Sequence, residues 1–314
     1  MDYSYLLDLA IILLCTKLLG LATRRVQMPQ VVGALLAGLI LGPAVFGILE
    51  ETAFITSVAE LGVIVLMFCA VMETDINELK ASGKASFVIA MCGVLVPLAG
   101  GFALSYLFNR PGVIESDAAA SLMLQNIFIG IILTATSVSI SVETLKELGK
   151  LKTRSGNAIL GAAIIDDILG IIGLTIVTSM ADSSVSIAVV LLKILGFFVF
   201  AAVVGVVVYR WYHSWVDHAE KGLRRHVILA FVFCLVMSYC AEEFFGVADI
   251  TGAFFAGLII ANTEKAEYLQ ERFNTISYLL LSPVFFASIG LKVVLPKMDS
   301  TIVIFSVLLV TVAV

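Results

Sequence analysis

Two adjacent aspartates, Asp166 and Asp167, lie within an apolar stretch at residues 156–180. At about 1.5 Å per helical residue, Asp166 is about 15 Å from the start of the stretch, close to mid-bilayer. One acid at that depth costs about 2.5–3.5 kcal/mol on insertion, so two adjacent acids indicate a function, although a salt-bridged packing pair is the alternative. Burial and mutual repulsion favour proton uptake, and the same oxygens suit a hard cation. A site that takes either ion, exposed to each side in turn, would exchange the two.

Hydroxyl side chains gather midway along the preceding apolar stretch, at residues 122–145. Five lie within eight residues, namely Thr134, Thr136, Ser137, Ser139 and Ser141. A lone hydroxyl in a helix commonly bonds back to its own backbone. A run this dense favours a discontinuous helix, in which freed carbonyls and hydroxyls can contact a cation.

The composition shows what kind of element must position these residues. Hydrophobic residues make up 61% of the chain and charged residues 14%, with a mean hydropathy of +1.09. A soluble domain carries about 25% charged residues. Long apolar runs separated by short polar loops therefore predict an all-α polytopic membrane protein. We predict eleven spans, at residues 3–23, 29–48, 55–74, 85–108, 122–145, 156–180, 186–212, 226–245, 247–263, 273–294 and 299–314.

The lysines and arginines indicate how the spans are oriented. With the N-terminus outside, only Arg110, Lys292 and Lys297 fall in outer loops, and Lys17 and Lys193 fall within spans. The inner loops hold Arg24, Arg25, Lys80, Lys84, Lys146, Lys150, Lys152, Arg154, Arg210, Lys221, Arg224, Arg225, Lys265 and Arg272. This positive-inside bias predicts a multi-pass cell-membrane protein whose N-terminus is outside.

Residues 32–40 (VGALLAGLI) and 251–259 (TGAFFAGLI) resemble each other in sequence. They belong to the second and ninth predicted spans, so the two copies cross the membrane in opposite directions. Inverted-topology repeats are typical of secondary transporters, which bind substrate near the midplane. Coincidental packing of small residues is the alternative.

The repeat also bears on the end of the chain. If the second copy of the repeat begins at the eighth span, the eleventh span corresponds to the fourth. Counterparts of the fifth and sixth spans are then missing. The last apolar run, residues 301–314, is shorter than a full crossing. We therefore expect a C-terminally truncated membrane domain.

Several of these segments resemble a known family. Residues 136–140 (TSVSI) and 163–167 (AIIDD) are similar to the sodium/proton exchanger domain of the monovalent cation:proton antiporter-2 family. Residues 29–43 resemble that family's second helix through PQVVG, AG and LGP. Residues 66–75 resemble its third helix, with Val71-Met72-Glu73 in place of the usual Gly-Leu-Glu.

The resemblance implies roles for individual residues. Asp167 would be the main ion and proton carrier, binding Na⁺ or K⁺ transiently. Asp166 would be its companion, held by a lysine of the eleventh span that is expected beyond Val314. Thr136 and Ser137 would lie at the unwound crossover. Lys292 and Lys297 belong to an outer loop and should not take the lysine's role.

The resemblance also implies an architecture of thirteen helices, of which about eleven are present. A scaffold at about residues 3–74 and 226–294 would form a homodimer. An ion-translocating core would occupy about residues 85–180 and 299–314, with a linker helix at about 186–212.

The expected function is secondary active exchange of a monovalent cation for protons by alternating access. The resemblance implies Na⁺ and electrogenic exchange, because an Asp-Asp pair resembles that of the family's electrogenic sodium/proton exchangers, with K⁺/H⁺ antiport or K⁺ efflux as the alternative. A sodium-coupled importer of organic anions and a channel are further alternatives. An intramembrane aspartyl protease needs two carboxylates from different helices, which this pair does not supply. We expect no enzyme activity, no cofactor and no nucleic-acid partner.

Overall fold

The computed structural model describes residues 3–74, 79, 81–110, 113–114, 120–181, 186–216, 223–261, 263, 265–295 and 300–313. Within these ranges every regular element is a helix. They are α1 (Ser4–Arg25), α2 (Gln30–Leu41), α3 (Ala53–Met72), α5 (Gly83–Phe108), α6 (Leu122–Thr134), α7 (Val138–Glu147), α8 (Arg154–Ala181), α9 (Ile187–Val216), α10 (Leu223–Phe245), α11 (Asp249–Ala261), α12 (Ala266–Ile276), the π-helix η1 (Ser277–Leu281), α13 (Ser282–Leu291) and α14 (Ser300–Ala313). Lys80, Lys221, Lys297, Asp75 and Val314 lie outside the described residues.

The helices agree with the prediction of an all-α polytopic membrane protein. In the described part of the chain, eight helical segments are long and apolar enough to cross a membrane, counting α6–α7 and α12–α13 as one segment each. The other three predicted spans correspond to α2, α11 and α14, which are shorter apolar helices. At about 1.5 Å per residue, α2 and α11 extend about 20 Å, less than the bilayer's hydrocarbon core.

Two predicted boundaries were wrong. The tenth span was expected at residues 273–294, but the helix begins at Ala266. The first turns of α12 are amphipathic. A search for continuous apolar residues detects the part of the helix that crosses the membrane and misses its polar beginning. The second span was expected to reach residue 48, but α2 ends at Leu41 and the chain continues without regular structure to Thr52.

The discontinuous helix is confirmed. α6 ends at Thr134 and α7 begins at Val138, with Ala135 in an extended conformation between them. Ser137 is the N-cap of α7, and its hydroxyl accepts a hydrogen bond from the backbone of Ile140 at 3.4 Å. An N-cap serine satisfies an N–H that has no partner within the helix, so the break is built into the local sequence.

The two repeat copies make equivalent packing contacts through their glycines. A Cβ added at Gly33 or Gly252 would collide with the helix before it, at Gly20 of α1 or at Met237 of α10. A Cβ added at the second glycine would collide with a helix of the other repeat unit. For Gly38 the collision is with Ala287 of α13, and for Gly257 it is with Phe68 of α3. The match between the copies is therefore a shared mode of packing.

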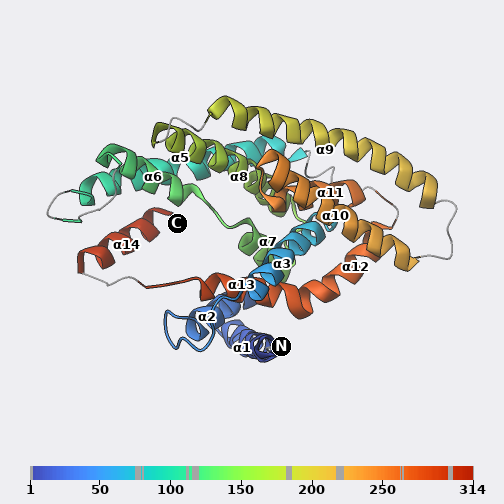
Figure 1. Cartoon of the computed structure of the whole chain (residues 1–314), viewed down its shortest axis with the longest axis horizontal. Helices are drawn as coiled ribbons and strands as arrows, with labels where there is room; N and C mark the ends of the chain where they lie inside the picture. The colour runs from blue at the N-terminus through green and yellow to red at the C-terminus, as the bar shows by residue number, and fades with distance from the viewer. Residues whose placement is uncertain are drawn as a thin grey trace.

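The helices form two groups by their contacts. One contains α1, α2, α3, α10, α11, α12, η1 and α13, and the other contains α5, α6, α8 and α14. Among the described residues, the main contacts between the groups involve α7, which touches α2, α3 and α8, or α9, which touches α8, α10 and α11. Figure 1 shows α9 along one edge of the molecule, with α1 and α2 at the opposite edge. Which group is fixed and which moves stays a prediction.

Candidate functional site: the aspartate pair and the helix break

Asp166 and Asp167 lie near the middle of α8, and both side chains are half-buried. Because successive helical residues are about 100° apart, the two carboxylates face different neighbours. α8 packs against α5, α6 and α7, so the pair lies among helices, with the broken helix on one side.

The break in the helix meets the first aspartate. The backbone amide of Thr136, within the break, lies near the Asp166 carboxylate. Oδ1 of Asp166 is buried and has no hydrogen-bond partner among the described residues. A buried carboxylate oxygen without a partner is costly, and such atoms commonly mark a place for a water molecule or an ion. The Asp166 carboxylate thus lies close to the break and has one oxygen without a partner among the described residues.

The ends of the two half-helices supply further groups at the same point. The last carbonyls of α6 and the first amides of α7 lack the partners that a continuous helix would give them. The negative end of the α6 dipole suits a cation, and the positive end of the α7 dipole suits an anion. This is the arrangement by which secondary transporters bind ions at discontinuous helices.

The hydroxyl run is largely bonded to backbone. Thr134 donates to the Ile131 carbonyl at 2.8 Å, and Ser141 donates to the Ser137 carbonyl at 3.3 Å. Thr136 is exposed and bonded only at 3.4 Å, to the Thr134 carbonyl. Of the run, the Thr136 hydroxyl is therefore the easiest to release toward an ion, and its role as a ligand stays a prediction.

The described lysines give the aspartates no partner. Among the described residues no ion pair joins a cation to Asp166 or Asp167. Lys292 binds Glu51, with Nζ 3.1 Å from Oε1, as expected for a residue outside the site. Lys297 lies outside the described residues.

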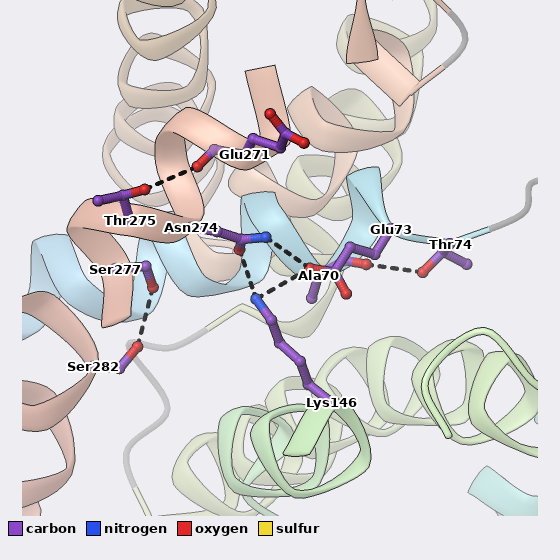
Figure 2. Close-up of polar contacts among 9 residues, drawn as sticks. All are labelled: Ala70, Glu73, Thr74, Lys146, Glu271, Asn274, Thr275, Ser277 and Ser282. Carbon is purple, nitrogen blue, oxygen red and sulfur yellow. Dashed lines mark hydrogen bonds and ion pairs between the residues drawn. The ribbon is translucent and has the colours of Figure 1, made fainter. Parts of the chain in front are cut away.

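A second polar cluster was missed by the sequence reasoning. Nζ of Lys146, in the last turn of α7, lies 3.1 Å from Oε1 of Glu73 and donates to Oδ1 of Asn274 at 2.6 Å. Asn274 in turn donates from Nδ2 to Oε1 of Glu73 at 3.0 Å. Figure 2 shows these three side chains converging from α7, from the end of α3 and from α12. We call these three residues the Lys146 cluster.

A cavity lies beside the Lys146 cluster. It has a volume of about 430 Å³ and is bounded by residues of α1, α2, α7, η1 and α13. Its charged lining groups are Lys17, Glu143, Lys146 and Glu147. Glu143 lies inside the apolar stretch at 122–145, and a charge within a predicted span was the signal that could have drawn attention to this region.

Comparison with known proteins identifies the family. The model of the family described as "Sodium/hydrogen exchanger, transmembrane" matches residues 10–314. The chain belongs to this family. It is therefore a multi-span membrane protein of a transporter family, in agreement with the resemblance noted in the sequence.

Members of the family with assigned names are similar over most of the chain. The chain is 40% identical to the "Probable Na(+)/H(+) antiporter GerT" of Bacillus cereus, over 91% of this chain and 73% of that protein. It is 36% identical to the "Na(+)/H(+)-K(+) antiporter GerN" of Bacillus cereus, over 93% of this chain and 73% of that protein. The solved structure of the sodium proton antiporter MjNhaP1 from Methanocaldococcus jannaschii at pH 8 matches with a TM-score of 0.62 at 19% identity, covering 90% of this chain and 69% of that one. This last likeness shows a shared fold.

Proposed function

We propose that the protein is a secondary active antiporter that exchanges a monovalent cation, with Na⁺ favoured, for protons by alternating access. The observation that carries the proposal is the contact between the helix break at Thr136 and the carboxylate of Asp166. It brings one intramembrane carboxylate, with a second adjacent to it on α8, to the point where half-helix ends expose backbone carbonyls. Oxygen ligands of this kind suit a hard monovalent cation, and the same carboxylates can carry protons.

The geometry supports different roles for the two aspartates. Asp166 lies near the Thr136 amide, so it is suited to hold the local structure and balance charge. Asp167 is half-buried and faces another direction on α8, so it is the better candidate to exchange a cation for protons. Thr136 and Ser137, both exposed at the break, are the proposed co-ligands.

Potassium is the alternative cation, because the name of one relative, GerN, includes both Na⁺ and K⁺. A second relative, at 28% identity, is a "K(+)/H(+) antiporter 1" of Saccharomyces cerevisiae. The adjacent aspartates favour Na⁺ and electrogenic exchange. The organic-anion importer is the weaker alternative, and an aspartyl protease is disfavoured because both aspartates lie on one helix.

The proposed architecture follows the two helix groups. The group with α1, α2, α3, α10, α11, α12, η1 and α13 would be the scaffold and dimer interface, and the group with α5, α6, α8 and α14 would form the moving core together with α7. α9 would be the linker. The N-terminus would be outside the cell membrane. The C-terminal end of α7 and the start of α8 would then face the cytoplasm.

The decisive experiment is cation-driven proton efflux from proteoliposomes that contain the purified protein. Na⁺ or K⁺ is added against an imposed pH gradient, and wild type is compared with Asp167→Asn. We expect Na⁺ to dissipate the gradient in wild type and the variant to behave like empty liposomes. Persistent efflux in Asp167→Asn would contradict the assignment of Asp167 as carrier.

A matched control separates loss of function from loss of fold. Asn retains the size and a polar surface of Asp, so the variant should purify with the same elution profile and melting temperature. Choline is a bulky cation whose methyl groups prevent close coordination by carboxylate oxygens, so it should not drive exchange. Proton efflux that choline drives as well as Na⁺ would indicate a leak and would contradict exchange.

A further inference from the structure

The Lys146 cluster joins α7, which contacts both helix groups, to the first group. Glu73 and Asn274 belong to the proposed scaffold, whereas Lys146 is on α7, which is continuous through the helix break with α6. In this conformation the end of α7 is therefore fixed to the end of α3 by an ion pair and to α12 by one hydrogen bond, and a second hydrogen bond joins Asn274 to Glu73. The exposed fraction of the side chains is 27% for Lys146 and 10% for Glu73. Such partial burial screens the pair less than an exposed surface ion pair.

A second contact ties the same turn of α7 to α2. Oε2 of Glu147 accepts a hydrogen bond from the backbone N–H of Gln30 at 2.7 Å. The N-cap of α2 is Pro29, which offers no side-chain cap, so Glu147 supplies from α7 the acceptor that the start of α2 lacks. α7 is thus attached to the first helix group at both α2 and α3.

The position of this attachment along α7 connects it to the aspartate pair. α7 is one short rigid helix of ten residues. Its N-terminal end follows Thr136, which contacts Asp166, and its last turn carries Lys146. The turn after α7 is fixed as well, because Gly149 has a positive φ of 64° and donates to the Lys146 carbonyl at 3.0 Å. A shift of α7 at one end is therefore transmitted to the other.

We propose that the Lys146 cluster is a conformational contact that must break and re-form in each transport cycle, and that Lys146 is the positioning residue that holds α7 against α3 and α12 in the state described here. The proposal rests on the proposed antiport function, because alternating access requires one helix group to move against the other. The cluster stabilises one of the two states, so weakening it shifts the population toward the other.

Asn274 makes the cluster suitable for a charge-swap test. Its side-chain amide has a donor and an acceptor, and it uses the donor for Glu73 and the acceptor for Lys146. In the double variant Glu73→Lys with Lys146→Glu, a 180° rotation of the Asn274 amide would turn its oxygen toward the new lysine at position 73. The same rotation would turn its nitrogen toward the new glutamate at position 146. The swap therefore preserves the ion pair and both hydrogen bonds, whereas each single change leaves a partly buried charge without a partner.

The experiment combines a contact readout with transport. Val142 is one turn before Lys146 on the same face of α7 and is only 1% exposed. In a background without the five native cysteines, Val142→Cys is introduced and its rate of maleimide labelling is measured in proteoliposomes. We expect Lys146→Gln and Glu73→Gln to raise this rate by about threefold or more, and the charge-swap variant to return it toward the parent value. Na⁺-driven exchange should change in both single variants and recover in the swap.

The Lys292–Glu51 pair is the matched control. Its Nζ–Oε1 distance is also 3.1 Å, but both residues belong to the first helix group. Lys292→Gln should leave the labelling rate and the exchange rate unchanged. Labelling of Val142→Cys that stays slow in Lys146→Gln would overturn the proposal, and so would a swap that recovers neither readout. Absence of exchange in wild type would instead contradict the proposed function, while the labelling would still show whether the cluster holds α7.

Discussion

The backbone amide of Thr136 lies near the carboxylate of Asp166, and this proximity joins the break between α6 and α7 to the middle of α8. The amide is a main-chain group, so its position is set by where the helix is interrupted. The Ser137 N-cap fixes the start of α7 one residue later. The environment of Asp166 therefore depends on the end of a half-helix, and α7 is also the element attached to the first helix group.

Asp166→Asn tests the role of the first aspartate. Asn removes the charge but retains a side-chain oxygen that can accept from the Thr136 amide, so the local structure should persist. We expect an unchanged melting temperature, residual cation/proton exchange and a loss of net charge movement per cycle. Currents on a solid-supported membrane, compared with proton flux in the same proteoliposomes, measure this change. Charge movement equal to that of wild type would contradict the companion role.

Thr136→Val tests the hydroxyl ligand separately from the amide. The variant keeps the N–H that lies near Asp166 and removes the hydroxyl, whose bond to Thr134 is long at 3.4 Å and easily exchanged for an ion. A contact worth about 0.5–1.5 kcal/mol corresponds to a roughly two- to tenfold weaker apparent affinity for Na⁺. The measurement is the Na⁺ concentration at half-maximal efflux. Thr136→Ser, which keeps the hydroxyl, should match wild type, and an unaltered affinity in Thr136→Val would exclude the hydroxyl as a ligand.

Ser137→Ala tests the cap that begins α7. Loss of an N-cap hydroxyl costs about 1 kcal/mol, because the Ile140 N–H at 3.4 Å loses its acceptor. We expect a lower melting temperature in detergent and a higher rate of hydrogen exchange confined to α7. Ser137→Thr keeps a capping hydroxyl and should restore both values. Equal protection of α7 in the alanine variant would show that packing alone fixes its start.

Sequence reasoning succeeded where a local pattern specifies local structure. The dense hydroxyl run at residues 134–141 predicted an interrupted helix, because serine and threonine compete for backbone hydrogen bonds and cap helices, and the structure places the interruption at residues 135–137. Apolar runs predicted the helices because the bilayer requires them, although the polar first turns of α12 were missed. The match between residues 32–40 and 251–259 predicted a repeat, and the structure shows that the glycines of the two copies make equivalent contacts.

Contacts between distant parts of the chain could not be predicted in this way. Lys146 is 128 residues from Asn274, and Asn274 is 201 residues from Glu73. In the sequence Lys146 is one of many inner-loop cations, and nothing local selects its partner. The Thr136–Asp166 contact depends likewise on how far α7 reaches toward α8. Such contacts are set by the register of packed helices, which a single sequence does not specify.

Gly38→Ala tests the close crossing of α2 and α13. A Cβ at Gly38 would lie 1.9 Å from the carbonyl oxygen of Ala287, a backbone atom that cannot move without separating the two helices. Overpacking of this kind costs about 1–3 kcal/mol or more, so we expect reduced yield and a lower melting temperature. Gly93→Ala in α5 is the control, because a Cβ there meets nothing within 4 Å, and alanine favours the helix. Its stability should equal or exceed that of wild type. Equal stability of the two variants would show that the crossing of α2 and α13 is wider than the structure indicates.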